Sequence, residues 1–289
     1  MKLAAIDIGS NAIRLQITRI LPHTEGGLSY KILENIRFPL RLGDDAFRMG
    51  EITFRNETKF IQLMLAFRTL LDLYEVDDVY GCATSALRDA NNGDRILKRS
   101  YDKSGLHIDV ISGEREAEIL QLAVQKENEV SDYIHLDVGG GSTEINLVKD
   151  KVSYARNSFE LGSVRNMRNR HSPEEWDAMK SWLLKNAKGQ FNMAIATGGN
   201  IKTIAKIAGA KKNVPLSLND LEKTIEEING YSVEERIDQL LMREDRADVI
   251  SYASEIYLNV IKWSGANQIL APDVGLKDGI IQMLYDRVK

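Results

Sequence analysis

The chain has 289 residues, a length that suits two domains of ~145 residues each better than one ordinary core. Hydrophobic residues make up 43% and charged residues 28%, which is the balance of a globular protein and excludes wholesale disorder. The net charge of −4 provides no global attraction to nucleic acid or to an anionic membrane. An anionic ligand would therefore have to be held by local groups.

Residues that support redox or metal chemistry are few. The single cysteine, Cys82, excludes an intramolecular disulfide and a cysteine-rich zinc site. The histidines are scattered without ligand spacing, so we expect no histidine metal cluster; they are His23, His107, His135 and His171. No apolar run approaches the ~18 residues of a membrane helix, and the first residues do not resemble a secretory signal. These observations favour a cytoplasmic enzyme with no membrane partner.

An internal repeat is the strongest sign of organisation. Residues 5–17 read Ala-Ile-Asp-Ile-Gly-Ser-Asn-Ala-Ile-Arg-Leu-Gln-Ile, and residues 135–147 read His-Leu-Asp-Val-Gly-Gly-Gly-Ser-Thr-Glu-Ile-Asn-Leu. Asp7 aligns with Asp137, and Gly9 aligns with Gly139. In each copy an apolar strand leads to an acid, a tight turn and an alternating apolar segment, which predicts a β-hairpin. Two similar hairpins predict two similar α/β domains with a cleft between them.

Further elements follow in chain order. Apolar spacing predicts a helix over 57–73, and short apolar runs predict strands at 79–83 and 107–111, with a polar segment over 84–93. A helix over 114–126 comes next. Ser172 and Pro173 predict a helix start with a capping box, and Ser232 with Glu235 repeats that pattern. A strand over 193–196 runs into a glycine turn, and long helices are expected over 246–263 and 276–288.

The domain boundary is expected in the polar segment 125–132. We therefore predict an N-terminal domain over 1–127 and a C-terminal domain over 128–289. The last helix, about 276–288, could pack back on the first domain.

The sharpest local motif is the glycine turn of the second hairpin. Gly139, Gly140 and Gly141 precede Ser142 and expose backbone N–H groups without any Cβ that would block a phosphate. Asp137 and Glu144 flank this turn, and carboxylate oxygens suit Mg²⁺ beside phosphate. A plain glycine-rich hairpin with solvated acids is equally compatible with this motif alone, but the second copy at Asp7 favours a ligand site.

Other candidate groups are less specific. Gly198 and Gly199 join a strand to a helix, where N–H donors could receive an anion or the turn could simply connect the two elements. Glu116, in the first turn of its helix, could activate a water, although first-turn acids are ordinary. Arg88 follows a strand and could grip a phosphate or form a surface ion pair. A basic run could guide a polyanion or be a solvated face; it contains Arg165, Arg168 and Arg170.

Together these motifs resemble the exopolyphosphatase/guanosine pentaphosphate phosphohydrolase (Ppx/GppA) family of the actin-like ATPase and sugar-kinase superfamily. The resemblance rests on ordered motifs along the whole chain. They span residues 5–11, 83–91, 112–117, 137–144, 161–165, 197–199, 246–250 and 275–279.

The resemblance implies an α/β protein with two actin-like (ribonuclease H-like) domains around an interdomain cleft. It implies that Glu116 is the general base and that Asp137 and Glu144 bind a divalent metal such as Mg²⁺, with Asp7 as a further ligand. Phosphate groups would be held by Arg88 and by three turns, whose residues are Gly9, Ser10, Asn11, Gly139, Gly140, Gly141, Ser142, Gly198 and Gly199. Longer members carry an added helical domain, so this chain is expected to be a two-domain form, which could be a homodimer.

Some positions depart from the family pattern. Ala12 replaces a usual Ser in the first turn, and Arg115 replaces an acid beside the base, which would make Glu116 less basic. Asn200 replaces a common Thr, and Lys277-Asp278 replaces a usual Arg-Glu pair. These departures leave turnover and substrate preference open.

The leading functional hypothesis is a Mg²⁺-dependent exopolyphosphatase that acts on inorganic polyphosphate. The nearest alternative is hydrolysis of guanosine pentaphosphate (pppGpp). An alternative of another class is a non-catalytic sensor that binds an alarmone or polyphosphate, and a sugar or acetate kinase is disfavoured because a kinase-type nucleotide signature is missing. No Ser–His–Asp or Cys–His arrangement supports covalent acyl chemistry.

Overall fold

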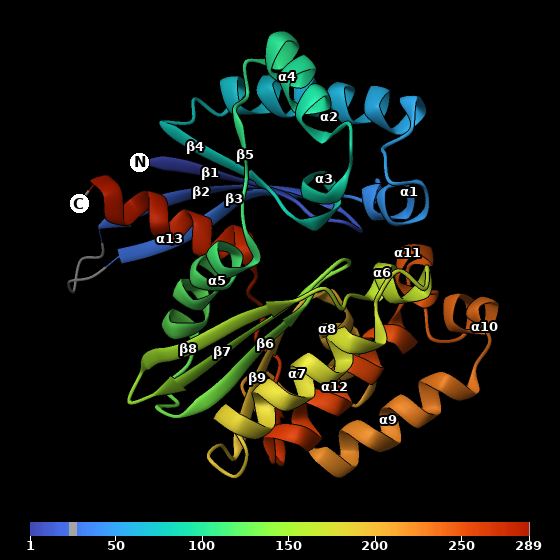
Figure 1. Cartoon of the computed structure of the whole chain (residues 1–289). Helices are drawn as coiled ribbons and strands as arrows, with labels where there is room; N and C mark the ends of the chain where they lie inside the picture. The colour runs from blue at the N-terminus through green and yellow to red at the C-terminus, as the bar shows by residue number, and fades with distance from the viewer. Residues whose placement is uncertain (23–27, 289) are drawn as a thin grey trace. The chain divides into compact units, whose positions relative to one another are not determined.

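The computed structural model describes residues 1–22 and 28–288, and its backbone divides into two compact units (Figure 1). The first unit contains the described residues of segments 1–123 and 276–288, and the second contains residues 124–275. His23 lies outside the described residues. Each unit is built on its own mixed sheet, so the α/β fold class predicted from the sequence is confirmed.

The first unit contains a five-stranded sheet in the order β3-β2-β1-β4-β5. β1 pairs antiparallel with β2 and parallel with β4, so the predicted first hairpin forms the centre of this sheet. The strands are β1 (Lys2–Ile8), β2 (Ile13–Pro22), β3 (Leu28–Phe38), β4 (Asp78–Ala83) and β5 (Ile108–Val110). The helices are α1 (Leu42–Met49), α2 (Phe54–Leu73), α3 (Ser85–Asp89), α4 (Gly93–Ser104), α5 (Gly113–Glu127, which crosses into the second unit) and α13 (Leu276–Val288).

The second unit contains a six-stranded sheet in the order β10-β11-β9-β6-β7-β8. β6 pairs antiparallel with β7 and parallel with β9, which repeats the arrangement of β1, β2 and β4. The strands are β6 (Tyr133–Val138), β7 (Thr143–Lys149), β8 (Val152–Phe159), β9 (Met193–Thr197), β10 (Leu216–Ser217) and β11 (Gln268–Leu270). The helices are α6 (Ser163–Met167), α7 (Pro173–Asn186), α8 (Gly199–Ile207), α9 (Leu218–Gly230), α10 (Val233–Asp238), α11 (Glu244–Ala247) and α12 (Ile250–Ser264).

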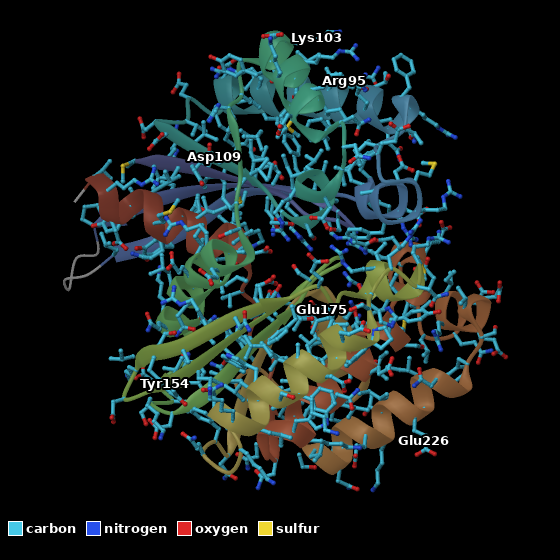
Figure 2. All side chains as sticks on the ribbon, in the orientation of Figure 1. Arg95, Lys103, Asp109, Tyr154, Glu175 and Glu226 are labelled. Atoms are coloured by element: carbon cyan, nitrogen blue, oxygen red, sulfur yellow. The ribbon has the colours of Figure 1, made fainter. Side chains whose placement is uncertain are left out.

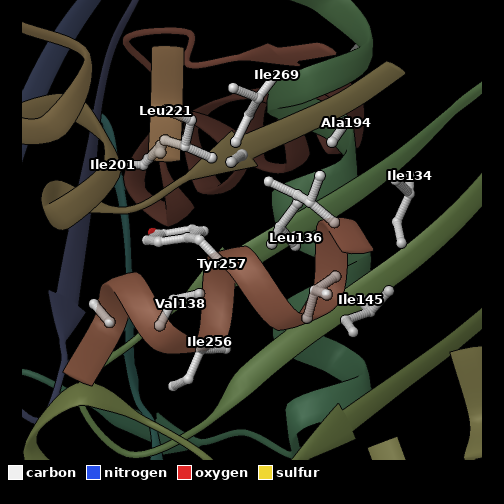
Figure 3. Close-up of a cluster of buried hydrophobic side chains, with 14 of the residues drawn as sticks. Ile134, Leu136, Val138, Ile145, Ala194, Ile201, Leu221, Ile256, Tyr257 and Ile269 are labelled. Carbon is white, nitrogen blue, oxygen red and sulfur yellow. The ribbon is translucent and has the colours of Figure 1, made fainter. Parts of the chain in front are cut away.

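The core of the second unit lies between its sheet and α12, which packs against β6 and against α7 and α9 (Figure 1). Leu136 and Val138 of β6 point into this core, together with Ile145 of β7 (Figure 3). Tyr257 of α12 is one of the largest fully buried side chains. The alternate residues of β6, His135 and Asp137, therefore face the other side of the sheet.

The helix starts predicted from the sequence are partly confirmed. Ser232 and Glu235 form the predicted capping box of α10. Ser172 caps α7 by accepting from the Glu175 N–H. The second bond of a capping box, from the Ser172 N–H to the Glu175 carboxylate, is replaced by another. The Glu175 carboxylate (Figure 2) instead accepts from the backbone N–H of Glu160, 3.1 Å away, because the end of β8 offers a donor there.

One sequence-based expectation was wrong in detail, and one helix had not been predicted. The predicted long helix over 246–263 is two helices, α11 and α12, interrupted at Asp248 and Val249. The interruption coincides with a side-chain contact, since Arg236 Nη1 donates to the Ala247 carbonyl at 3.0 Å. The polar segment 84–93 contains the helix α3, which has five residues and is too short for its apolar spacing to be recognised.

Among the described residues, no helix has the length and apolar character that crossing a lipid bilayer requires.

Candidate functional site

In the second unit, the hairpin of β6 and β7 places two acids opposite each other. Asp137 pairs with Glu144 in the strand register, and one carboxylate oxygen of each lies within 4.8 Å of the other. Ser158 Oγ donates to Glu144 Oε1 at 2.9 Å from the neighbouring strand β8. Like charges directly opposite each other destabilise a sheet. A hard divalent cation would remove this repulsion, and its preference for oxygen ligands fits the two carboxylates.

The glycine turn between these strands is held by its carbonyl groups. The Gly140 carbonyl accepts from the N–H groups of Val164 and Arg165 at 2.8 and 2.9 Å, and the Gly139 carbonyl accepts from Ser163 N at 3.0 Å. A Cβ at Gly162 would lie 2.5 Å from Gly141, so α6 begins in direct contact with the turn. Since the C=O and N–H of a trans peptide point in opposite directions, the N–H groups of the same peptide planes face away from α6.

The basic run of α6 contributes to this turn in an unexpected way. The buried Arg165 donates from Nε to the Gly141 carbonyl at 2.6 Å, and its Nη1 lies 3.5 Å from Glu160 Oε2. Its guanidinium therefore stabilises the glycine turn from behind. Arg168 is half-buried and Arg170 is exposed, so of the three only Arg170 presents a largely solvated side chain.

The third glycine turn lies beside Asp137. Gly198 adopts a φ of 102°, a backbone conformation that favours glycine. A Cβ there would lie 3.6 Å from Asp137 Oδ1 and 3.0 Å from the Val138 carbonyl. Arg246 packs on Gly199 and donates to Asn200 Oδ1 at 2.8 Å. This turn and the second hairpin are about 60 residues apart in the sequence but lie next to each other in the structure.

Two buried side chains near Asp137 were not identified as functional from the sequence. Burial lowers the pKa of His135 to about 3, so its imidazole is neutral at ordinary pH. Burial, and then the Asp137 charge, raise the pKa of Tyr257, whose hydroxyl donates to the Thr197 carbonyl at 2.8 Å. The only sequence signal was the alternation in β6, which puts His135 on the same face as Asp137.

The first hairpin has the same backbone but a different charge pattern. Gly9 N donates to the Ala12 carbonyl at 3.2 Å, as Gly139 N donates to the Ser142 carbonyl at 2.9 Å. Asp7, however, pairs in register with Arg14 and forms an ion pair with it at 2.8 Å. In this hairpin, therefore, the residue that faces the acid is itself a cation. The prediction that Asp7 is a further metal ligand therefore lacks the support that a second facing acid gives to Asp137.

Neighbouring elements hold the first turn in place. Ser10 Oγ lies 2.8 Å from Ser85 Oγ at the start of α3. The Ser10 carbonyl accepts from Gly43 N at 2.8 Å, and the Asn11 carbonyl accepts from Arg41 N at 3.1 Å, both at the start of α1. The hydroxyl of Ser10 and the backbone of Asn11 are therefore fixed by contacts within the first unit.

Glu116 lies in the first turn of α5, as the sequence predicted, and its N–H donates to the Ser112 carbonyl. Burial, and then the charges of Asp7 and Glu116, raise the pKa of the Cys82 thiol in β4. Both carboxylates therefore lie close to the end of β4. Arg88 Nη1 donates to the Ile111 carbonyl at 3.0 Å, which brings its guanidinium to the segment that opens α5.

The residues that depart from the family pattern have local partners. Arg115, which was expected to reduce the basicity of Glu116, forms an ion pair with Glu118 at 2.9 Å and reaches Met283 of α13. Lys277 donates to Gln16 Oε1 at 2.5 Å, and Gln16 donates to Asp278 at 3.0 Å. Arg115, Lys277 and Asp278 therefore all have contacts within the first unit.

Comparisons with known proteins agree with this architecture. A model of the Ppx/GppA phosphatase family matches residues 20–288. Exopolyphosphatase 1 of Mycobacterium tuberculosis is 25% identical over 279 residues, which cover 86% of this chain and 78% of that protein. The guanosine-5′-triphosphate,3′-diphosphate pyrophosphatase of Photobacterium profundum is 24% identical, and the alignment covers 99% of this chain and 60% of that protein.

Solved structures extend the similarity over the whole chain. The exopolyphosphatase from Cytophaga hutchinsonii aligns with a TM-score of 0.87 at 25% identity, covering 100% of this chain and 99% of that one. The Ppx/GppA family member of Aquifex aeolicus aligns with a TM-score of 0.81 at 25% identity, with the same coverage. The actin-like fold expected from the sequence is confirmed.

Proposed function

We propose that this chain, which belongs to the Ppx/GppA phosphatase family, hydrolyses the terminal phosphoanhydride bond of inorganic polyphosphate. The observation that carries the proposal is the facing pair of Asp137 and Glu144. Beside this pair lies a glycine turn whose carbonyls accept hydrogen bonds from the backbone of α6. This arrangement combines oxygen ligands for a cation with backbone amides for an anion. Both are needed to bind a metal-bound phosphate chain.

Asp137 and Glu144 are the residues that we propose to hold a divalent cation such as Mg²⁺. When bound, the cation would neutralise charge on the phosphate oxygens, which supplies much of the stabilisation that phosphoryl transfer needs. Asp7 is not included, because Arg14 already neutralises it. The chain's own contribution is to orient both acids, through Ser158 for Glu144 and Thr197 for Asp137.

Glu116 is the proposed general base, which accepts a proton from the attacking water. Its position in the first turn of α5 fixes its backbone. The neighbouring Arg115 forms its ion pair with Glu118. Arg88 and the glycine amides of the turns are proposed to bind the phosphate oxygens. A guanidinium suits this role because its donors match phosphate geometry.

The catalytic proposal is tested by phosphate release from long-chain polyphosphate with Mg²⁺. Replacing Glu116 by Gln removes the base while keeping its shape, so the rate should fall by about 10²–10⁴-fold. The control is Glu114→Gln, which makes the same change at an exposed acid in the same turn and should leave the rate within about twofold of the original. Equal rates for the Glu116 variant and the unchanged protein would overturn the proposed base.

The substrate is tested by side-by-side rates on polyphosphate and pppGpp. The second substrate is relevant because the Photobacterium relative is named for that activity and aligns with 99% of this chain. A higher kcat/KM on polyphosphate supports our assignment, and a higher kcat/KM on pppGpp replaces it. Tight binding of either ligand without turnover, with any divalent metal, would instead identify a sensor.

A further inference from the structure

A line of hydrogen-bonded side chains crosses three neighbouring strands of the second sheet and ends at Asp137. Asn146 Nδ2 in β7 lies 3.2 Å from His135 Nδ1 in β6, and His135 Nε2 lies 3.0 Å from Thr197 Oγ1 in β9. Thr197 Oγ1 donates to Asp137 Oδ1. The first three side chains are completely buried, so water does not compete for these bonds.

The direction of each hydrogen bond follows from the first one. The Asn146 amide nitrogen can only donate, so His135 Nδ1 must accept and the ring proton must lie on Nε2. His135 Nε2 then donates to Thr197 Oγ1, and the hydroxyl proton of Thr197 is directed to Asp137. The opposite amide orientation would reverse the chain, and Thr197 would donate to His135 and no longer to the carboxylate. The orientation of the Asn146 amide and the hydrogen bond that Asp137 receives are thus coupled.

The internal repeat shows that the fold does not require this line. When the two sheets are aligned by register, Ala5 corresponds to His135, Gln16 to Asn146 and Cys82 to Thr197. The acid of that hairpin, Asp7, is bound by Arg14. The polar line therefore occurs in the copy whose acid faces a second acid, and is absent from the copy whose acid faces a cation.

We propose that Asn146, His135 and Thr197 are positioning residues, which hold the Asp137 carboxylate in one orientation for a divalent cation. The inference rests on the proposed function, because it takes Asp137 to be a metal ligand. A donated hydrogen bond restricts rotation of the carboxylate, as partners of metal ligands commonly do. The backbone of Thr197 is in turn held by Tyr257.

The test is Mn²⁺ binding to the full-length protein, measured by calorimetry and by electron paramagnetic resonance without substrate. Thr197→Val keeps the side-chain shape and removes the hydroxyl, so we expect Mn²⁺ to bind about 10–100-fold more weakly. Thr197→Ser restores the donor and should bind within about threefold of the original protein. In activity assays, Thr197→Val should require more Mg²⁺ for half-maximal rate, and saturating Mg²⁺ should restore most of kcat.

A matched control separates positioning from general damage. Thr224 is a buried threonine of α9 whose hydroxyl donates to the Asp220 carbonyl in its own helix. Thr224→Val therefore makes the same chemical change, and Mn²⁺ affinity should be unchanged. If Thr197→Val does not fold, Thr197→Cys replaces it. This variant introduces the residue found at the matching register of the first sheet, and its weak S–H donor should lower Mn²⁺ affinity in the same direction.

Asp137→Asn distinguishes failure of this inference from failure of the proposed metal site. If Asp137→Asn binds Mn²⁺ as well as the original protein, the metal site itself is wrong, and the positioning inference falls with it. If Asp137→Asn loses binding while folded Thr197→Val keeps it, only the positioning role is overturned. Loss of binding in both, with rescue by Thr197→Ser, supports the inference.

Discussion

At the scale of single residues, the two hairpins show how one facing side chain changes the chemistry of the same motif. Asp7 and Asp137 occupy matching positions before matching turns, yet Asp7 faces Arg14 and Asp137 faces Glu144. A carboxylate paired with a guanidinium has less to gain from a metal ion. Two facing carboxylates have an unfavourable interaction that a divalent ion removes. The motif alone therefore does not identify a metal ligand.

The difference predicts opposite results for the two aspartates. Asp7→Asn should change the Mn²⁺ affinity of the protein by less than threefold. Asp137→Asn should lower it by more than the ~10–100-fold typical of losing a partner of a ligand. Mn²⁺ titration of both variants, with circular dichroism as the check on folding, makes the comparison. Equal losses in the two variants would mean that Asp7 binds the metal as well.

The single cysteine gives a second prediction at this scale. Burial, and then the charges of Asp7, Glu116 and Asp109, raise the pKa of the Cys82 thiol well above its usual value. The nucleophilic thiolate is therefore scarce and inaccessible. An aromatic disulfide reagent at pH 8 should not react with the native protein, but should react with one thiol in urea. Rapid reaction of the native protein would contradict the buried position of Cys82.

Residue motifs were predictable from the sequence where their parts lie close together in the chain. Asp137, the glycines and Glu144 occupy one segment of eight residues, so their chemistry could be recognised from their spacing. The contact of His135 with Thr197 joins residues separated by 62 positions, and it exists because β6 and β9 pair in one register. Spacing carries no information on such pairing. His135 therefore looked like an isolated histidine.

At the scale of elements, local signals predicted where helices begin, and distant contacts determined where one was interrupted. Ser172 and Ser232 cap their helices by bonds to residues three positions away. The interruption between α11 and α12 coincides with a bond from Arg236 to Ala247, which no local pattern encodes. The predicted helix over 246–263 was continuous because its apolar residues keep helical spacing across the break.

The packing of α13 predicts the effect of one substitution. A Cβ at Gly279 would lie 1.9 Å from the Ile119 carbonyl of α5, so the two helices can approach this closely only with glycine. Gly279→Ala should therefore lower the free energy of unfolding by about 1–3 kcal/mol, measured by urea denaturation. Gly230→Ala, at the end of α9, meets no atom within 4 Å and serves as the control. Equal stability of both variants would contradict the close contact.

At the scale of the whole molecule, the first unit is built from two segments that are far apart in the chain. The core of that unit includes Leu3 and Ala5 of β1, Ile119 and Leu120 of α5, and buried residues of α13. Among the described residues, the buried side chains that form the core of the second unit lie between 134 and 269. The second unit is therefore continuous in the chain, whereas the first depends on a helix that follows after more than 150 intervening residues.

This difference predicts how separate pieces of the chain behave. Residues 128–275 should unfold cooperatively on heating, followed by circular dichroism. Residues 1–127 should not, because losing the apolar face of α13 removes about 1.5–3 kcal/mol for each buried side chain from a total stability of about 5–15 kcal/mol. The missing side chains are Leu276, Ile280, Ile281, Met283 and Leu284.

Joining residues 276–288 to residues 1–127 through a flexible Gly/Ser linker should restore a cooperative transition in the first unit. The control carries the same linker and the same thirteen residues in shuffled order, which keeps composition and charge but removes the apolar face of α13. If residues 1–127 alone unfold as cooperatively as the joined piece, α13 contributes little to that core. Rescue by the native order and not by the shuffled one would show that the last helix folds with the first hairpin.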